Sequence, residues 1–330
     1  MKTIKFVLPF FVFLFLSCLC LSTWANSSID NNNIVITDYH QIFIPCYDKN
    51  GNLLIAIRMY FIGATPYYLV VNPYTFATES APAANFKNRN ISSKGNTTPG
   101  YYTWDQIKNT PYMKVLFRYT SGPYPMNNYG VTHAEHAVNG EFLTVDMCPS
   151  AKPFEEQFFK ALVAIANRNH QPVPLAISLT GIWMIEHPKE FNWLTQQEKA
   201  NTLQITWTNH TFSHLYYPDL PINQNFLLTT ESNITHEILD TEKMLLEKHQ
   251  LPSVFFRFPG LVSNKKLVLM MRHFGLIPIA SNAWLAKGQQ AKIGSIILVH
   301  GNSNEPQGIK DFMPMLQYSN LNLLPLSKAF

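Results

Sequence analysis

Charged residues are scarce in this chain of 330 residues: Asp, Glu, Lys and Arg make up 14% of it, and the formal net charge is +4. The sequence contains no run of Lys or Arg. A protein that binds nucleic acid needs a basic patch or stripe against the phosphates, so we expect no nucleic-acid partner. Hydrophobic residues make up 46% of the chain, as in globular proteins that bury a core. The length suits about two domains.

Long hydrophobic runs are absent after the N-terminus. There, Lys2 and Lys5 precede the run "FVLPFFVFLFLSCLCLS", and small residues follow in "STWAN". The run is short for a membrane span and contains Pro9, which favours a cleaved signal peptide over residues 1–25. An uncleaved anchor and a lipid anchor on Cys18 are less favoured alternatives. We therefore expect an exported protein, periplasmic or secreted, with no stable membrane span after cleavage.

Cysteine is also scarce, with four residues in the chain. Two of them lie in the predicted signal peptide, which leaves Cys46 and Cys148. In an oxidising compartment these two could form a disulfide. The sequence leaves open whether they pair or are two buried free thiols.

Residues 26–138 lack the regular alternation of strands and helices that follows. They are rich in Asn, Tyr, Thr and Pro, with short apolar runs such as "NIVITDY", "QIFIPCY" and "LLIAIRMYFIG". The stretch "DKNG" at 48–51 predicts a hairpin between two of these runs. We interpret this part as a small β-rich domain. Its two histidines near the boundary, His133 and His136, are interpreted as solvated loop residues.

Residues 139–330 alternate between short apolar runs and amphipathic segments. The expected strands are "EFLTVDM", "VPLAISLTG", "QITW", "SVFFRF", "LIPIA" and "SIILVH". The expected helices are "KPFEEQFFKALVAIANR", "TTESNITHEILDTEKMLLEKHQ" and "SNKKLVLMMRHFG", the last ending at Gly275. This order predicts a parallel α/β sheet, open or closed into a barrel. In such folds the functional residues gather at the carboxyl ends of the strands.

Ionisable residues mark those strand ends. Asp146 ends "FLTVD", Arg257 ends "SVFFR" and His300 ends "SIILVH". His210 and His214 follow "QITW" in the stretch "TNHTFSH". On a turn of helix, two imidazoles four residues apart face the same way and can reach one divalent cation. We therefore predict a catalytic metal site at the mouth of the barrel.

These segments resemble a known family. Asp146, the stretch "HTFSH" at 210–214, "FFRFPG" and "GSIILVH" are similar, in order and spacing, to the successive motifs of polysaccharide deacetylases. These are the NodB-homology domains of carbohydrate esterase family four, and the resemblance spans about residues 139–305. It implies a distorted (β/α) barrel, a divalent metal that is most often zinc, and removal of acetyl groups from a polysaccharide, peptidoglycan-like or chitin-like.

The resemblance also implies a role for each matched residue. His210 and His214 would be metal ligands, and Asp146 would be the general base, held by Arg257. His300 would be the general acid. The residues implied to contact the substrate are Leu298 in the acetyl pocket, Trp284, Pro259 in the adjacent turn, and Gly260, whose backbone N–H would face the oxyanion.

The sequence departs from the family pattern at the first motif. Met147 stands where the family has a second aspartate that binds the metal. Methionine sulfur is a poor ligand for zinc. We therefore expect the metal to be held by two histidines and waters, or to recruit Asp146.

Two further departures concern neighbours of the site. Gly260 stands where an aromatic residue usually follows the proline. Asn282 and Ala283 stand where the family often has an aspartate that tunes the catalytic histidine. His300 is therefore expected to lack a carboxylate partner, with Asp311 as a distant candidate.

Two other functions remain open. The barrel could bind a glycan or a metal without turnover. Alternatively, the chain could be a structural protein of the cell envelope in which the N-terminal domain does the work.

Overall fold

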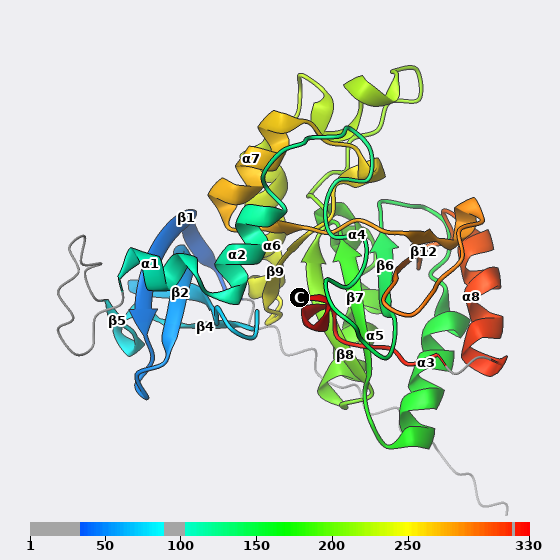
Figure 1. Ribbon diagram of the computed structural model, residues 1–330, viewed down its shortest axis with the longest axis horizontal. Coiled ribbons are helices and arrows are strands. Elements are labelled where there is room, and N and C mark those ends of the chain that lie inside the picture. The colour runs from blue at the N-terminus through cyan, green and yellow to red at the C-terminus, as the bar shows by residue number, and fades with distance from the viewer. Residues whose placement is uncertain (1–33, 89–102, 319–320) are drawn as a thin grey trace, which may run out of the picture. The chain divides into compact units, whose positions relative to one another are not determined.

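The computed structural model describes residues 34–88, 103–318 and 321–330 (Figure 1). The predicted signal peptide, residues 1–25, lies outside the described residues. The described strands form two sheets, one of five strands and one of seven.

The first sheet is antiparallel, with the strand order β4-β3-β2-β1-β5. Its strands are β1 (Ile36–Tyr47), β2 (Leu53–Ile62), β3 (Thr65–Val71), β4 (Thr78–Pro82) and β5 (Lys87–Asn88). The predicted hairpin at 48–51 is confirmed. Its Asp48 side chain accepts hydrogen bonds of 2.8 Å from the backbone N–H groups of Asn50 and Asn52. Gly51 adopts the left-handed φ of +83° that this turn requires.

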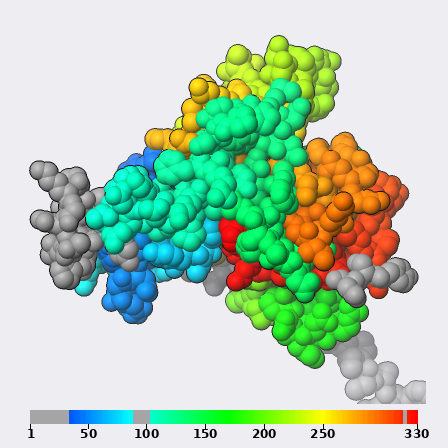
Figure 2. Space-filling view, viewed as in Figure 1, coloured from blue at the N-terminus to red at the C-terminus, as the bar shows by residue number. Residues whose placement is uncertain are grey.

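A long irregular segment connects this sheet to the second one. After helices α1 (Trp104–Lys108) and α2 (Pro111–Arg118), residues 119–141 contain no helix or longer strand. They spread over the face seen in Figure 2, where they are coloured teal to green. Isolated bridges join them to the parallel sheet region, including Val131 with Ile279. His133 and His136 are exposed here, as the loop interpretation predicts.

The second sheet is parallel, with the strand order β10-β9-β8-β7-β6-β12-β11. Its strands are β6 (Phe142–Met147), β7 (Val173–Leu179), β8 (Leu203–Asn209), β9 (Pro252–Phe256), β10 (Ile277–Pro278), β11 (Ala283–Trp284) and β12 (Ile296–His300). The helices that alternate with them are α3 (Glu156–Asn169), α4 (Gly181–Glu186), α5 (Pro188–Lys199), α6 (Ile234–Glu247), α7 (Lys265–Phe274) and α8 (Pro306–Tyr318). The sheet curls as an open barrel (Figure 1). The predicted distorted (β/α) barrel with a smaller β-rich N-terminal part is confirmed.

Hydrophobic packing joins the two sheets. Ile55 and Ile57 of β2 lie in the same buried cluster as Val254 and Phe255 of β9. Burial of such side chains is the main source of folding free energy, about 1.5–3 kcal/mol for each fully buried one. The described residues from Ile34 to Phe330 form one compact unit. The domain boundaries predicted at 26, 138 and 139 stay predictions.

Within the described part of the chain, no helix combines the length and the hydrophobicity needed to cross a bilayer.

Candidate active site

A cavity of about 800 Å³ opens at the carboxyl ends of the parallel strands. Its lining includes seven of the residues singled out from the sequence, namely Asp146, His210, His214, Gly260, Trp284, Leu298 and His300. Arg257 is fully buried and contacts Asp146, and Pro259 is buried in the turn next to Gly260. The structure therefore brings the predicted site residues together, while their catalytic roles stay predictions.

The histidine pair lies on an irregular turn, and the predicted helical turn is wrong. Strand β8 ends at Asn209, and no helix follows until residue 222. Thr211 and His214 have positive φ angles of 74° and 50°, a conformation that is rare and costly for a β-branched residue. This chain reversal, rather than helical spacing, places the two imidazole rings 4.8 Å apart between centroids.

Two side chains hold that strained turn in place. Asn209 accepts a hydrogen bond of 2.9 Å from the backbone N–H of Thr211 and donates one of 2.9 Å to the carbonyl of Ile238 in α6. Glu237 of α6 accepts hydrogen bonds of 2.9 Å from the backbone N–H groups of residues 212 and 213, and one from the Ser213 hydroxyl. The turn is therefore fixed to α6 before any ligand binds.

Asp146 and Arg257 form a buried ion pair behind the cavity. The Arg257 guanidinium donates from Nη1 to Asp146 Oδ1 and to the Thr144 hydroxyl, both at 2.8 Å, and from Nη2 to the Ala280 carbonyl at 3.1 Å. Burial alone would raise the pKa of the Asp146 carboxyl. The charges of Arg257, His210 and His300 outweigh burial, so that this pKa is lowered. Asp146 is therefore a carboxylate at neutral pH.

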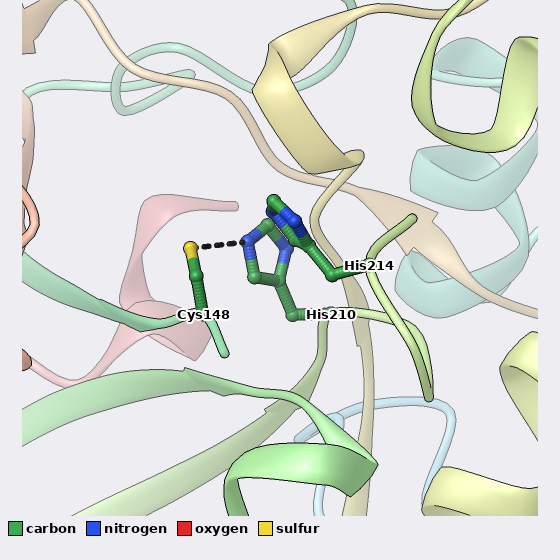
Figure 3. Close-up of side chains that lie close together, drawn as sticks. All are labelled: Cys148, His210 and His214. Atoms are coloured by element: carbon green, nitrogen blue, oxygen red, sulfur yellow. Dashed lines mark hydrogen bonds between the residues drawn. The ribbon is translucent and has the colours of Figure 1, made fainter. Parts of the chain in front are cut away.

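Cys148 also faces the cavity, next to the histidines (Figure 3). Its Sγ lies 3.6 Å from Nε2 of His210. Side chains alternate across a strand, so that Asp146 and Cys148 point to the cavity while Met147 points into the hydrophobic core. Met147 is therefore not at a ligand position. Residue alternation along "TVDMC" is the signal that would have identified Cys148 from the sequence.

The two cysteines do not form a disulfide. Both are free and buried, which confirms one of the two alternatives that the sequence left open. Burial raises the pKa of the Cys46 thiol to about 12. At Cys148, burial has the same direction but is outweighed by His214, His210 and His300, and the pKa is well below its usual range.

The donor atoms of Cys148, His210 and His214 fit a divalent metal ion. All three lie within 4.8 Å of one another, and the chain forms no other such group among the described residues. Nδ1 of His210 lies 2.9 Å from the Arg257 carbonyl, which fixes this nitrogen as the donor and leaves Nε2 as the ligand atom. One thiol and two imidazoles form a donor set typical of zinc.

His300 has a carboxylate partner, so the expectation that it lacks one is wrong. Glu305 Oε2 lies 3.2 Å from His300 Nδ1, as an ion pair rather than an aligned hydrogen bond. Glu305 also accepts from the Trp284 indole at 2.5 Å and pairs with Lys287 at 2.9 Å. The more distant candidate, Asp311, accepts from Gln307 on an exposed part of α8.

These contacts shift both pKa values. Burial would lower the pKa of His300, but its side-chain contacts with Cys148 and Glu305 and the charges of Cys148 and Asp146 raise it to about 10. Burial would raise the pKa of Glu305, but His300, Lys287 and Trp284 lower it to about 2. His300 is therefore an imidazolium beside a carboxylate over the neutral range.

An aromatic ring lies against Gly260, although the residue that follows Pro259 is Gly260 itself and not an aromatic residue. A Cβ atom at Gly260 would be 2.3 Å from the Phe226 ring, and Gly260 has a φ of +61°. The ring of Phe226 stacks on Tyr216 and contacts His214 edge-on. Phe226 comes from the long connection between β8 and α6, so its spatial relation to Gly260 could not be read from local sequence.

Comparison with known proteins finds similarities to each part of the chain. Residues 37–113 match the family described as the RP012 protein N-terminal domain. The chain is similar to a family 4 carbohydrate esterase from Bacillus anthracis, with 16% identity, a TM-score of 0.43, and coverage of 66% of this chain and 90% of that one.

Two other solved structures show the same relation. One is a family 4 carbohydrate esterase from Streptomyces lividans in complex with acetate, with 19% identity, a TM-score of 0.39, and coverage of 58% and 95%. The other is a family 4 pseudoenzyme from Bacillus anthracis, with 14% identity, a TM-score of 0.38, and coverage of 58% and 64%. All three structures bear the name of the family that the sequence motifs resemble. Such identities do not assign an activity to this chain.

Proposed function

We propose that this protein hydrolyses acetyl groups, as amides or esters, on an acetylated polysaccharide of the peptidoglycan or chitin type. One observation carries the proposal: an ionised carboxylate, a cationic imidazole and a cluster of metal-binding side chains line the same cavity. Metal-assisted attack of water on an acetyl carbonyl uses these three functions together. The motif resemblance supports the same reaction and its usual metal, zinc.

The charge states of Asp146 and His300 suit them to opposite proton transfers. Asp146 accepts the proton of the attacking water, and Arg257 keeps it ionised and oriented through Oδ1. His300 donates a proton to the departing amine or alcohol, and Glu305 holds the imidazolium that can do so. A divalent cation bound at the histidine pair would lower the pKa of water and polarise the acetyl carbonyl.

The remaining predicted residues shape the substrate site. Leu298 is buried and lines the cavity, where it would contact the acetyl methyl group. Gly260 would offer its backbone N–H to the oxyanion, and Pro259 sets the turn that presents it. Trp284 lies on the cavity wall near His300 and would contact the sugar.

The test is release of acetate by the purified chain from acetylated chitooligosaccharides and from peptidoglycan. We expect release that stops after chelation and returns with zinc. A protein that retains stoichiometric zinc yet releases no acetate from this panel would instead be a glycan-binding protein. We also propose export to the periplasm or the medium, tested by fractionating cells that express the full sequence.

A further inference from the structure

We propose that Cys148 supplies the third protein ligand of the metal centre as a thiolate, and that the centre therefore takes a thiophilic divalent cation of the zinc class. On binding, an S–metal bond forms and the thiol proton passes to solvent. This inference rests on the proposed metal-dependent function only for the presence of a cation.

The structure holds the Cys148 side chain in place before a metal binds. The Thr180 hydroxyl, at the start of α4, donates to the Met147 carbonyl at 2.9 Å. The buried Asn302 amide donates to the Cys148 carbonyl at 2.6 Å. The two peptide units that flank Cys148 are thus each held by a hydrogen bond, one from a residue after β7 and one from a residue after β12. The thiol does not have to rearrange in order to reach the histidines.

The distances match those of a coordinated metal. Zinc binds sulfur at about 2.3 Å and nitrogen at about 2.0–2.1 Å, so a tetrahedral S–Zn–N angle separates the two donors by about 3.6 Å. The observed separation of Cys148 Sγ and His210 Nε2 is 3.6 Å. The third donor, from His214, lies within 4.8 Å of both, and all three residues line the cavity.

Asp146 is the competing third ligand, because its Oδ2 lies 3.8 Å from the same His210 nitrogen. However, its Oδ1 is bound by Arg257 at 2.8 Å. No Asp146 oxygen lies within the group of mutually close donor atoms, although carboxylate oxygens qualify for it. With Cys148 as ligand, Asp146 stays free to act as a base. The choice of ligand also affects metal preference, since thiolates favour zinc and soft metals over Mg²⁺, Ca²⁺ and Mn²⁺.

The experiment is titration of the metal-free full chain with Co²⁺ under reducing conditions. A thiolate bound to Co²⁺ gives an intense charge-transfer band in the near ultraviolet, which imidazole and carboxylate ligands do not give. We expect this band in the wild type and in the matched control Cys46→Ala, which removes the other buried cysteine. Cys148→Ala and Cys148→Ser should lose the band, and their zinc affinity should fall by more than the roughly 10–100-fold that loss of an outer partner costs.

Asp146→Asn separates the two candidate ligands and should keep the band. The inference is overturned if the wild type binds Co²⁺ without the band, if the band persists without Cys148, or if Asp146→Asn abolishes it. The wild-type spectrum decides this even if a Cys148 variant does not fold. A thiolate band without acetate release would contradict the proposed reaction alone, whereas acetate release without the band would contradict the ligand assignment alone.

Discussion

Among the described residues, two arginine–carboxylate pairs are buried, and they differ in whether the carboxylate keeps an oxygen open to a cavity. Arg58 of β2 and Arg257 after β9 are both fully buried. Arg58 donates two hydrogen bonds to the carboxylate of Glu242 in α6, from Nε at 2.7 Å and from Nη2 at 2.9 Å. Its Nη1 donates to the carbonyls of Ile57 and Phe274. The Tyr39 hydroxyl also donates to Glu242, at 2.9 Å.

The pair at the cavity is less completely matched. Arg257 reaches Asp146 through one nitrogen, and its Nε has no hydrogen-bond partner within the described structure. The second oxygen of Asp146 faces His210 and the cavity. The pair away from the cavity is thus closed on both sides, whereas the pair at the cavity keeps one oxygen available. Burial of an ion pair therefore does not by itself indicate function, but an open hydrogen-bonding position toward a cavity does.

The largest expected effect is on catalysis, from Asp146→Asn. This change keeps the shape of the side chain but removes the base, so acetate release should fall by roughly 10²–10⁴-fold. Initial rates on an acetylated chitooligosaccharide measure it. Rates close to those of the wild type would show that Asp146 is not the base. The Arg257–Asp146 pair would then not differ in function from the Arg58–Glu242 pair.

Glu242→Gln should affect stability instead. It leaves Arg58 as a buried cation without its charged partner, which costs about 3–5 kcal/mol of unfolding free energy. Urea unfolding measures the loss, while the rate per folded molecule should not change. The control is Arg58→Met combined with Glu242→Leu, which should recover much of the stability because no lone charge is left. A large loss of rate in folded Glu242→Gln would show that this pair also serves the site.

Glu305→Gln should shift the pH dependence of kcat/KM. Glu305 helps to raise the pKa of His300 to about 10. Cys148 contributes most to that rise and Glu305 adds to it, so loss of the Glu305 carboxylate should lower the pKa of His300 and the ring should lose its proton at lower pH. The alkaline limb of kcat/KM should therefore shift to lower pH in pH-rate profiles measured on one substrate. An unshifted limb with reduced kcat would mean that Glu305 only positions the ring.

The smallest expected effect is that of Tyr39→Phe. It removes one neutral donor from the Arg58–Glu242 pair but leaves both charges matched. A hydrogen bond to a charged group is worth about 1.5–3 kcal/mol, so unfolding free energy should fall by less than in Glu242→Gln. Activity should be unchanged, and urea unfolding beside the Glu242 variants provides the ranking.

The parts of the site that follow local patterns could be predicted from the sequence. Asp146, Arg257 and His300 each end an apolar run, and the rule that parallel strands gather their carboxyl ends was sufficient to bring them together. The strands, the main helices and the hairpin at 48–51 follow from the same periodicities.

The missed residues depend on tertiary structure. Glu305 reaches His300 from the turn before α8, and Phe226 reaches Gly260 across a long connection. Neither the Glu305–His300 contact nor the Phe226–Gly260 contact corresponds to a sequence spacing that would predict it. Cys148 differs, because the alternation of side chains along β6 continues to this residue and places it on the same face as Asp146. Comparison of the motif by sequence position alone pointed to Met147 as the replaced ligand, although Met147 lies on the opposite face. The turn at 210–214 was predicted helical because i, i+4 spacing does not reveal left-handed residues.

Helix α6 places carboxylates against both regions of the molecule. Glu242 receives Arg58 from the antiparallel sheet, and Glu237 receives the backbone of the turn that carries His210 and His214. Five residues separate them, which is about 7.5 Å along a helix axis. Because both sets of contacts lie on one helix, α6 connects the antiparallel sheet to the turn that carries the histidine pair.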